Sequence, residues 1–524
     1  MRHENFCVID LRTLFRSNFF GNVAGIFLLI IIFAAFAWAD IQQSDTENAR
    51  QLIKQAEKLT RKGDFAEAEK ILRQVTINYP QNSKAKTSLA YNLLKQRRLL
   101  EAYEFSFEVA KNDPNNSYAF AVLGATFLSA GNFKEAQLSF INALRLDKRQ
   151  ALAWAGLGTL NFYENRVFVG LENLRTAIYF EPREPDYLFS LGQIAARAEN
   201  YTEAADAYER FLQVSQQTDS ERRDRIKGLI NFLRFLGNKQ SLYVSDGAAQ
   251  TAVSFKLIND RPVVQLKINK NEEPLNFVLD TGSGISVISK DTAKKLQIKP
   301  ITRGGLARAI GGSGKFEIIY GFLRMVSIGD VKIKNVPIYI REFHTKDEKI
   351  DGYIGLSLIS KFLTTINYGN STFALKKKDS IENNDSNVVS LPLRLTSSGF
   401  LSGEIQLEGI EPALNFIVDT GASISVISDE LANTKELSRF LKNEKLRVVG
   451  AAGITENVST FLLPRVTFGS HSRESITAIA LNLDIINEAS GFQQAGILGG
   501  NFLKNYNLTF DFENSKVIFV PIVK

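Results

Sequence analysis

The sequence predicts two modules of different fold class, an α-helical repeat array followed by two mostly β lobes. Three observations lead to this prediction. Residues 49–216 repeat with a period of 34, and after about residue 240 the composition changes to alternating β-branched and polar residues with many glycines. Within that second half, two stretches closely match each other. At about 150 residues per domain, a chain of 524 residues has room for the three or four domains that this division requires.

The overall composition excludes several classes of protein. With 44% hydrophobic and 23% charged residues, the chain is neither disordered nor collagen-like nor a polytopic membrane protein. The net charge is +7 without a long run of one sign, so we expect no nucleic-acid partner. Cys7 is the single cysteine and there are three histidines, too few for a disulfide framework or a Cys/His zinc site. We therefore expect neither a metal nor a cofactor.

Residues 1–39 have the three parts of a secretory signal, which are a basic flank, an apolar run over 23–39 and the small-x-small ending Ala37-Trp38-Ala39. The run of 17 residues is shorter than the ~20 that cross a bilayer comfortably, so we predict a cleaved signal peptide, with an uncleaved membrane anchor as the alternative. Removal of 1–39 leaves a chain without cysteine, which suits an oxidising compartment. We expect a bacterial protein whose bulk lies in the periplasm, free or anchored.

Residues 49–238 are predicted to form paired helices with a C-terminal cap near 219–237. Small residues, turn residues and prolines each recur at their own phase of the 34-residue period: Ala68, Ala102, Ala136, Gly170 and Ala204; Gly63, Arg97, Gly131, Asn165 and Glu199; Pro80, Pro114 and Pro182. A small residue lets two helices approach closely, and proline ends a helix. With Leu123-Gly124 and Trp154-Ala155-Gly156-Leu157-Gly158, the pattern resembles the tetratricopeptide repeat. The resemblance implies an α-solenoid.

Two functions are open for this array. The resemblance implies a concave surface that binds a peptide or a partner protein. The alternative is a spacer that only positions the second half of the chain.

The second half contains two copies of one acidic motif, in predicted lobes over 256–377 and 389–522 joined by a polar linker over 379–388. Each copy has an apolar strand that leads into Asp-Thr-Gly, then a glycine-containing turn 31 residues after the aspartate, then a second glycine pair. The motifs are Asp280-Thr281-Gly282 and Asp419-Thr420-Gly421; the turns are Gly311-Gly312-Ser313-Gly314 and Gly450-Ala451-Ala452-Gly453; the later pairs are Gly352 with Gly355 and Gly496 with Gly499. A single Asp-Thr-Gly is weak evidence, but a duplicate in the same downstream order is strong.

These features resemble the aspartic proteases, and most closely the retropepsin-like bacterial aspartyl proteases. The resemblance implies two acid-protease β-barrel lobes and an aspartic endopeptidase activity carried by Asp280 and Asp419. Two carboxylates within ~3 Å share one proton, because both cannot ionise. The ionised member then takes a proton from water while the protonated member polarises the peptide carbonyl.

The resemblance also implies roles for neighbouring residues. Thr281 and Thr420 would brace the two loops across the lobes, and Gly282 and Gly421 would let the backbones approach. The glycine-containing turns would be flaps over an extended substrate, with Gly311, Gly312, Gly314, Gly450 and Gly453 as their candidate residues. Neither turn contains the tyrosine that pepsin-type flaps usually carry.

The position after each Asp-Thr-Gly differs between the copies, with Ser283 in the first and Ala422 in the second. A hydroxyl donated to the neighbouring carboxylate favours its ionised form. We therefore expect Asp280 to be the more readily ionised member of the pair.

Alternatives remain at the level of assembly and activity. We expect a monomer whose two lobes pair within one chain, whereas a homodimer would join Asp280 to Asp280 and Asp419 to Asp419. The competing function is a non-catalytic envelope scaffold that binds peptides or partner proteins without cutting them. Only a protease would lose turnover when an aspartate is replaced by asparagine.

Overall fold

The computed structural model describes residues 47–216, 219–239, 241–312, 314–344, 349–377, 389–392 and 394–522. The expected signal or anchor segment 1–39, the linker 379–388 and Ser313 lie outside the described residues. In the part of the chain that is described, no helix is long and apolar enough to cross a bilayer. The chain divides into two compact units, 1–96 and 97–524, which are described separately.

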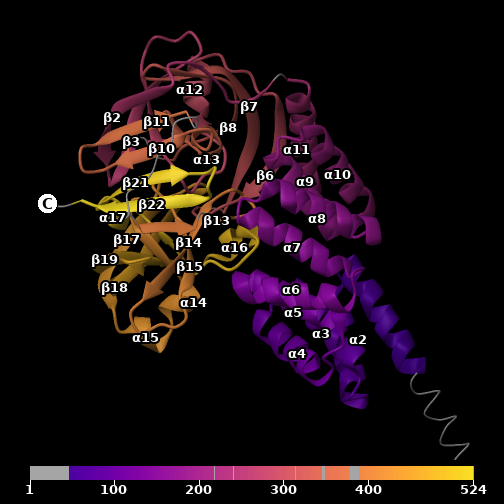
Figure 1. The fold of residues 1–524 in the computed structure, drawn as a ribbon. Coiled ribbons are helices and arrows are strands. Elements are labelled where there is room, and N and C mark those ends of the chain that lie inside the picture. The colour runs from indigo at the N-terminus through magenta and orange to yellow at the C-terminus, as the bar shows by residue number, and fades with distance from the viewer. Residues whose placement is uncertain are drawn as a thin grey trace, which may run out of the picture. The chain divides into compact units, whose positions relative to one another are not determined.

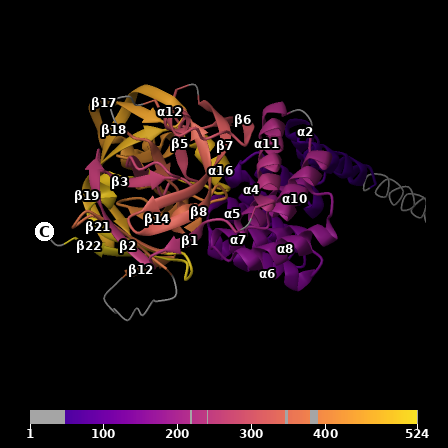
Figure 2. The ribbon, with the colours of Figure 1, turned by 90° about the horizontal axis from the view of Figure 1, so that it is seen from above.

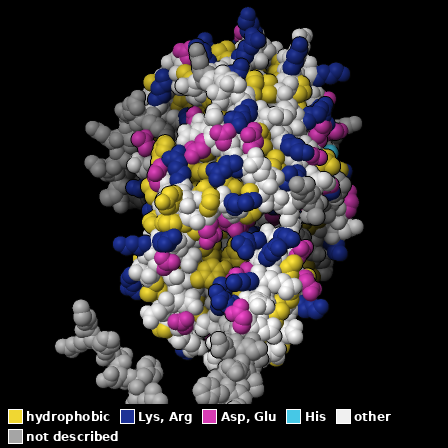
Figure 3. Space-filling view, turned by 90° about the vertical axis from the view of Figure 1, so that its right-hand side faces the viewer, with side chains coloured by type: hydrophobic (Ala, Val, Ile, Leu, Met, Phe, Trp, Pro, Cys, Tyr) yellow, Lys and Arg dark blue, Asp and Glu magenta, His cyan; other side chains and the backbone are white. Residues whose placement is uncertain are grey.

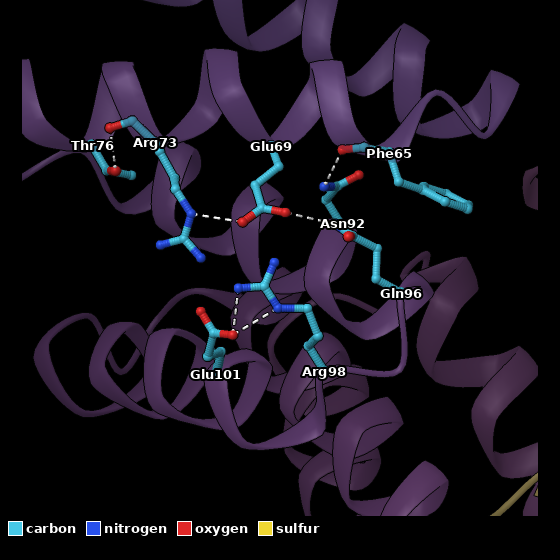
Figure 4. Close-up of polar contacts among 8 residues, drawn as sticks. All are labelled: Phe65, Glu69, Arg73, Thr76, Asn92, Gln96, Arg98 and Glu101. Carbon is cyan, nitrogen blue, oxygen red and sulfur yellow. Dashed lines mark hydrogen bonds and ion pairs between the residues drawn. The ribbon is translucent and has the colours of Figure 1, made fainter. Parts of the chain in front are cut away.

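The first unit contains a helix over 47–62 followed by α2 (Phe65–Asn78) and α3 (Ser83–Lys95). Among its buried polar residues is Asn92, whose side chain donates to the Phe65 carbonyl at 3.0 Å and accepts from Thr60 Oγ1 at 2.9 Å. The Glu69 carboxylate accepts from Arg73 Nε at 2.7 Å and from Gln96 Nε2 at 3.0 Å (Figure 4). The bonds of Asn92 and Gln96 join helices that follow one another in the chain, and the bond between Glu69 and Arg73 lies within α2.

The second unit begins with the remaining repeat helices, α4 to α11. Their bounds are α4 (Leu99–Asn112), α5 (Ser117–Ala130), α6 (Phe133–Leu146), α7 (Ala151–Tyr163), α8 (Val167–Phe180), α9 (Pro185–Arg197), α10 (Tyr201–Val214) and α11 (Ser220–Gly237). Asn116 caps α5 by accepting from the backbone N–H of Ala119 at 3.0 Å, which satisfies one of the free donors at a helix start.

The predicted repeat phase is confirmed by the structure. Helices α2, α4, α6, α8 and α10 begin at residues 34 apart, namely Phe65, Leu99, Phe133, Val167 and Tyr201. Each is preceded by one of the predicted turn residues, and all five of these have a left-handed backbone, with φ between 61° and 84°: Gly63, Arg97, Gly131, Asn165 and Glu199. The predicted small residues lie in close helix contacts; a Cβ atom on Gly170, for example, would lie 2.9 Å from the Gly158 carbonyl oxygen.

The rest of the second unit consists of two β-rich lobes with corresponding strands. The first lobe comprises β1 (Val244–Gly247), β2 (Gln250–Ile258), β3 (Arg261–Ile268), β4 (Leu275–Leu279), β5 (Val287–Ser289), α12 (Lys290–Lys295), β6 (Thr302–Arg308), β7 (Lys315–Ile328), β8 (Val331–Arg341), β9 (Gly352–Ile354), α13 (Leu356–Ile359), β10 (Leu363–Asn367) and β11 (Thr372–Lys376).

The second lobe repeats this order with two extra helices, α15 before β17 and α16 between β19 and β20. It comprises β12 (Val389–Pro392), β13 (Arg394–Leu395), β14 (Leu401–Leu407), β15 (Leu414–Val418), β16 (Ser425–Ser428), α14 (Asp429–Ala432), α15 (Lys435–Ser438), β17 (Leu441–Gly450), β18 (Gly453–Phe468), β19 (His471–Leu481), α16 (Asp484–Ser490), β20 (Gly496–Leu498), α17 (Gly500–Leu503), β21 (Tyr506–Asp511) and β22 (Lys516–Pro521).

The lobes are joined by their C-terminal hairpins, which lie side by side in Figure 1. Strand β10 pairs antiparallel with β21 from Thr364↔Phe510 to Asn367↔Asn507. Among the described strands this pairing extends a 14-stranded sheet across both lobes, and most of the second lobe forms an 8-stranded sheet. One hydrophobic core continues through both lobes, from Phe277 and Ile288 to Phe416 and Leu498. The predicted order, a helical array followed by two β lobes, is therefore confirmed.

The last helix of the array packs on the first lobe, beside β6 and β7 (Figure 2). Phe232 of α11 stacks on Tyr320 of β7 with ring centroids 4.5 Å apart. Phe235 meets Phe322 edge-on at 5.5 Å. Phe232 and Leu236 thereby belong to the same hydrophobic core as the β lobes, so α11 is part of the support of the first lobe.

Candidate active site

Each Asp-Thr-Gly loop follows a buried strand and is anchored at its first residue. The Asp280 N–H donates to the Ile354 carbonyl at 3.0 Å, and the Asp419 N–H donates to the Leu498 carbonyl at 3.0 Å. These carbonyls belong to β9 and β20, which pair in parallel with β4 and β15. The apolar residues before each aspartate therefore fill the core and hold the loop where the chain leaves the sheet.

The two loops are hydrogen-bonded to each other through their threonines. Thr281 Oγ1 donates to the Val418 carbonyl at 2.6 Å, and Thr420 Oγ1 donates to the Leu279 carbonyl at 2.7 Å. Each hydroxyl also accepts the backbone N–H of the opposite threonine, at 3.0 and 3.2 Å. Both threonines are fully buried, so these four bonds have no competition from water.

The glycines of the motifs bring the two carboxyl groups together. A Cβ atom on Gly421 would lie 2.7 Å from Asp280 Cγ, and one on Gly282 would overlap the Asp419 carboxyl group. The Gly421 N–H donates to Asp419 Oδ1 at 2.7 Å. Each carboxyl group thus rests on the backbone of the opposite loop, at a distance that only glycine permits.

The carboxyl groups of Asp280 and Asp419 interact directly, and both residues are partly buried. Burial raises the pKa of Asp280 well above its ordinary value, and the negative charge of Asp419 and the hydrogen bond to it act in the same direction. Burial also raises the pKa of Asp419, but there the Gly421 N–H and the hydrogen bond from Asp280 oppose the rise. Since the pKa of both interacting carboxyl groups is raised, the pair holds one shared proton near neutral pH.

The structure corrects the expectation that the Ser283 hydroxyl donates to the neighbouring carboxylate and so favours ionisation of Asp280. The Ser283 hydroxyl donates to the Ile285 carbonyl at 2.9 Å and so closes its own loop instead of solvating the carboxylate. The backbone at this position has the same contact in both lobes: the carbonyl of Ser283 accepts from Leu356 N at 2.8 Å, and that of Ala422 from Gly500 N at 2.7 Å. A hydroxyl is not needed for that contact, which is why alanine serves in the second lobe.

The glycine-containing turns lie at the tips of two hairpins, β6–β7 and β17–β18, and the tips meet. Gly312 N donates to the Ile454 carbonyl at 3.1 Å, and Ala452 N donates to the Ile310 carbonyl at 3.0 Å. The turn backbones are left-handed at Gly311 (φ 101°), Gly312 (φ 51°), Gly314 (φ 71°) and Gly453 (φ 134°). Gly450 also packs at the junction, where its Cβ atom would lie 2.8 Å from the Ile310 carbonyl carbon. The hairpins close on each other through backbone bonds, so the missing tyrosine is not required for this contact.

Sequence reasoning missed two kinds of residue at this site. Ser286 Oγ accepts from Gly355 N, and Ser425 Oγ accepts from Gly499 N, each at 3.1 Å, which ties the loops to the later glycine pairs. The identical serine in both copies was a usable signal. Arg341 at the end of β8 donates from Nη1 to the Ala451 carbonyl at 2.9 Å, and its charge lowers the pKa of Asp280. A lone arginine far along the chain from Asp280 gave no signal.

Known families match both halves of the chain. Residues 264–358 and 404–502 match the aspartyl protease family model, and residues 53–117 and 170–219 match a tetratricopeptide repeat model. The chain therefore carries tetratricopeptide repeats followed by two aspartyl protease segments, which confirms the resemblance seen in the sequence. In the ranges that the structure describes, no group of three or more His, Cys, Asp or Glu side chains is placed to hold a metal ion.

Solved structures similar to this chain include two from the repeat class. One is TTC0263, a thermophilic TPR protein of Thermus thermophilus, with 18% identity, covering 35% of this chain and 98% of that chain at a TM-score of 0.31. Another is PilF of Pseudomonas aeruginosa, with 16% identity, covering 37% of this chain and 89% of that chain at a TM-score of 0.29. Comparison with curated proteins gives no match.

Proposed function

We propose that the protein is an aspartic endopeptidase with Asp280 and Asp419 as its catalytic residues. The single observation that carries this proposal is the close approach of the two partly buried carboxyl groups, each packed on the glycine of the opposite loop. A pair of carboxyls that shares one proton supplies a base and an acid at the same place, which is what hydrolysis of a peptide bond needs.

The mechanism needs one shared proton on the pair and starts with that proton on Asp280. Ionised Asp419 removes a proton from a bound water, and the oxygen of that water attacks the peptide carbonyl carbon. At the same time Asp280 donates its proton to the carbonyl oxygen. In the second step the C–N bond breaks and the leaving nitrogen receives the proton that Asp419 took from water. The protonation of the pair is then restored by the hydroxyl proton of the collapsing intermediate. The closed hairpins exclude bulk water from this step.

The lobes are proposed to act within one chain. The pairing of β10 with β21 and the reciprocal threonine bonds support this over a homodimer of like lobes. A quenched peptide library would be offered between about pH 4 and pH 8 to the full chain in mild detergent, and to its Asp280→Asn and Asp419→Asn variants. Cleavage by a monomer that is lost in both variants is the expected result. Activity that survives in one variant as a dimer contradicts pairing within the chain, and a folded wild type that cuts nothing contradicts the endopeptidase proposal.

The array is proposed to bind a protein partner rather than to act as a spacer. Apolar side chains protrude from its helices, with Leu100, Phe168 and Tyr179 exposed by 71%, 73% and 80%. Figure 3 shows such apolar side chains at the surface among basic and acidic ones. Isolated exposed apolar residues are common on protein surfaces, so binding has to be tested directly. The test is crosslinking in cells from a photoreactive residue placed at Phe168, and the control places it at exposed Lys504. Equal partner yields at both sites would contradict binding by the array.

We further propose that the protein is exported and that its bulk lies in the periplasm. The basic flank and the apolar run over 23–39 support this. Cell fractionation combined with N-terminal sequencing tests it. A chain that starts after Ala39 indicates cleavage, an intact chain in the membrane fraction indicates an anchor, and recovery in the cytoplasm contradicts export.

A further inference from the structure

The two lobes present different residues at one equivalent position. Strand β8 pairs in parallel with β5 so that Arg341 lies opposite Ser289, and β19 pairs in parallel with β16 so that Leu481 lies opposite Ser428. Ser289 and Ser428 are each nine residues beyond their motif aspartate. The duplicated fold therefore places an arginine on the side of the first lobe and a leucine on the side of the second.

Arg341 lies between the carboxyl pair and the opposite hairpin. Its guanidinium is over the rings of Phe343 and Tyr353, at 5.2 and 5.6 Å from their centroids. From the same position Nη1 reaches the Ala451 carbonyl at the tip of β17–β18, and the charge acts on Asp280. Two aromatic faces thus hold the arginine between Asp280 and the tip of β17–β18.

The corresponding wall of the second lobe is apolar. Tyr353 lies opposite Val278, and its counterpart Ile497 lies opposite Ile417, so the two are equivalent by strand register. Ile497, Leu481 and nearby Leu483 pack in one hydrophobic cluster. Ala422 of the catalytic loop and Ile310 of the opposite hairpin tip belong to the same cluster, which places it beside the carboxyl pair.

Arg341 has no ion-pair partner among the described residues, although it is partly buried. Burial lowers the pKa of its guanidinium, so its charge is already incompletely solvated. A guanidinium has five N–H donors in a planar fork, and the Ala451 carbonyl takes one of them. A partly buried cation of this kind is stabilised by a carboxylate, which a guanidinium can bind through two parallel hydrogen bonds.

We propose that Arg341 makes the enzyme selective for substrates with an acidic side chain, aspartate or glutamate, at the residue that lies against the first lobe beside the cleaved bond. The residue against the second lobe is then apolar, because Leu481, Leu483 and Ile497 form that wall. This inference rests on the proposed endopeptidase function and names its substrate class. Arg341 is in this view a specificity residue and takes no part in proton transfer.

The test uses octapeptides of alanine and leucine that carry a single Glu, Gln or Lys at each position in turn. For the full-chain enzyme we expect kcat/KM to favour Glu over Gln by about 10- to 100-fold at one position near the cut, the range of a charged hydrogen bond. Arg341→Leu, which copies the residue of the second lobe, should abolish this ratio. Arg341→Glu should reverse it in favour of Lys. Arg465→Leu is the matched control, since it removes an exposed arginine paired with Glu474, and it should keep the ratio.

The outcomes separate the two proposals. An active wild type without an acidic preference, or one whose preference survives Arg341→Leu, overturns the inference and leaves the endopeptidase function standing. If no peptide is cut, binding of the same Glu and Gln peptides to the full chain is measured by fluorescence anisotropy. A Glu preference in binding that depends on Arg341 then upholds the inference while the endopeptidase function falls, and equal binding overturns both.

Discussion

Gly228 in helix α11 packs directly on Gly304 in strand β6 of the first hairpin: a Cβ atom on Gly228 would lie 2.5 Å from the Gly304 Cα atom. Two polar contacts flank this point. Arg225 Nη1 donates to the Leu306 carbonyl at 3.0 Å, and Glu221 pairs with Lys315 at 2.7 Å. The last helix of the repeat array is therefore the outer support of one of the two hairpins whose tips meet.

Gly228→Val should loosen that hairpin. The added side chain meets backbone that cannot rotate away, and overpacking of this kind costs about 1–3 kcal/mol. We expect a lower Tm and faster amide exchange over residues 302–308, with KM raised more than kcat is lowered. Gly237→Ala in the same helix is the control, because its Cβ atom would lie 3.1 Å from the Thr202 side-chain oxygen and at an ordinary 3.7 Å from its other neighbours. Unchanged exchange in Gly228→Val would show that α11 does not support the hairpin.

Thr281→Val should show how much the hydrogen bonds of the catalytic loops, as distinct from the shape of the side chain, contribute to the free energy of unfolding. Valine keeps the volume but removes the donor to the Val418 carbonyl and the acceptor for the Thr420 N–H. A buried polar group left without a partner costs about 1–3 kcal/mol, so we expect a loss of that size per group in urea unfolding. Thr281→Ser, which keeps the hydroxyl, should retain most of the stability.

The double variant Thr281→Val with Thr420→Val gives a further check on the reciprocal network. Since each threonine bonds to the other, the two losses should not add. Additive losses would mean that the two loops are held independently.

Gly421→Ala should reduce kcat by roughly 100-fold or more, because displacement of a reacting group by about 1 Å has an effect of that order. The new methyl group would press on Asp280 Cγ at 2.7 Å and move the carboxyl group away from Asp419. Gly282→Ala should act in the same way on Asp419. Peptide turnover and circular dichroism would be measured together, with Gly369→Ala, in the turn between β10 and β11, as the control. A variant Gly421→Ala with full activity would contradict the direct packing of the carboxyl group on this glycine.

Asp280→Asn should stabilise the protein increasingly as pH rises from about 4 towards 7. The raised pKa of Asp280 means that the folded state keeps a proton that the unfolded state releases above an ordinary carboxyl pKa of about 3.9. The free energy of unfolding of the wild type therefore falls with rising pH in that interval. Asparagine does not titrate, so the difference in urea midpoint should widen with pH.

Asp246→Asn is the control of opposite sign for this pH series. Lys334 lowers the pKa of the exposed Asp246 carboxyl, which contributes to stability above its unfolded pKa and loses that contribution in acid. Its replacement should therefore never stabilise the protein at neutral pH. A constant difference between Asp280→Asn and wild type across the series would show that the pKa of Asp280 is not raised.

Much of the architecture was readable in the sequence because it repeats. The 34-residue phase predicted where α2, α4, α6, α8 and α10 begin, since a left-handed turn residue and a small contact residue are local requirements of every helix pair. The duplicated Asp-Thr-Gly drew attention to Asp280 and Asp419 in the same way. The expected effect of Ser283 was wrong because a side chain can bond within its own turn, and the choice of the Ile285 carbonyl depends on loop geometry.

Local pattern thus accounts for the helices, the strands and the position of each motif, since these depend on neighbours a few residues apart. The relation between distant parts depended on packing of the folded chain. The bond from Thr281 to Val418 spans 137 residues, and the meeting of Arg341 with Ala451 spans 110. Nothing in the composition of either segment specifies such a partner. Those contacts, the support of β6 by α11 and the unlike walls beside the carboxyl pair arise only when the shared core brings the lobes and the array together.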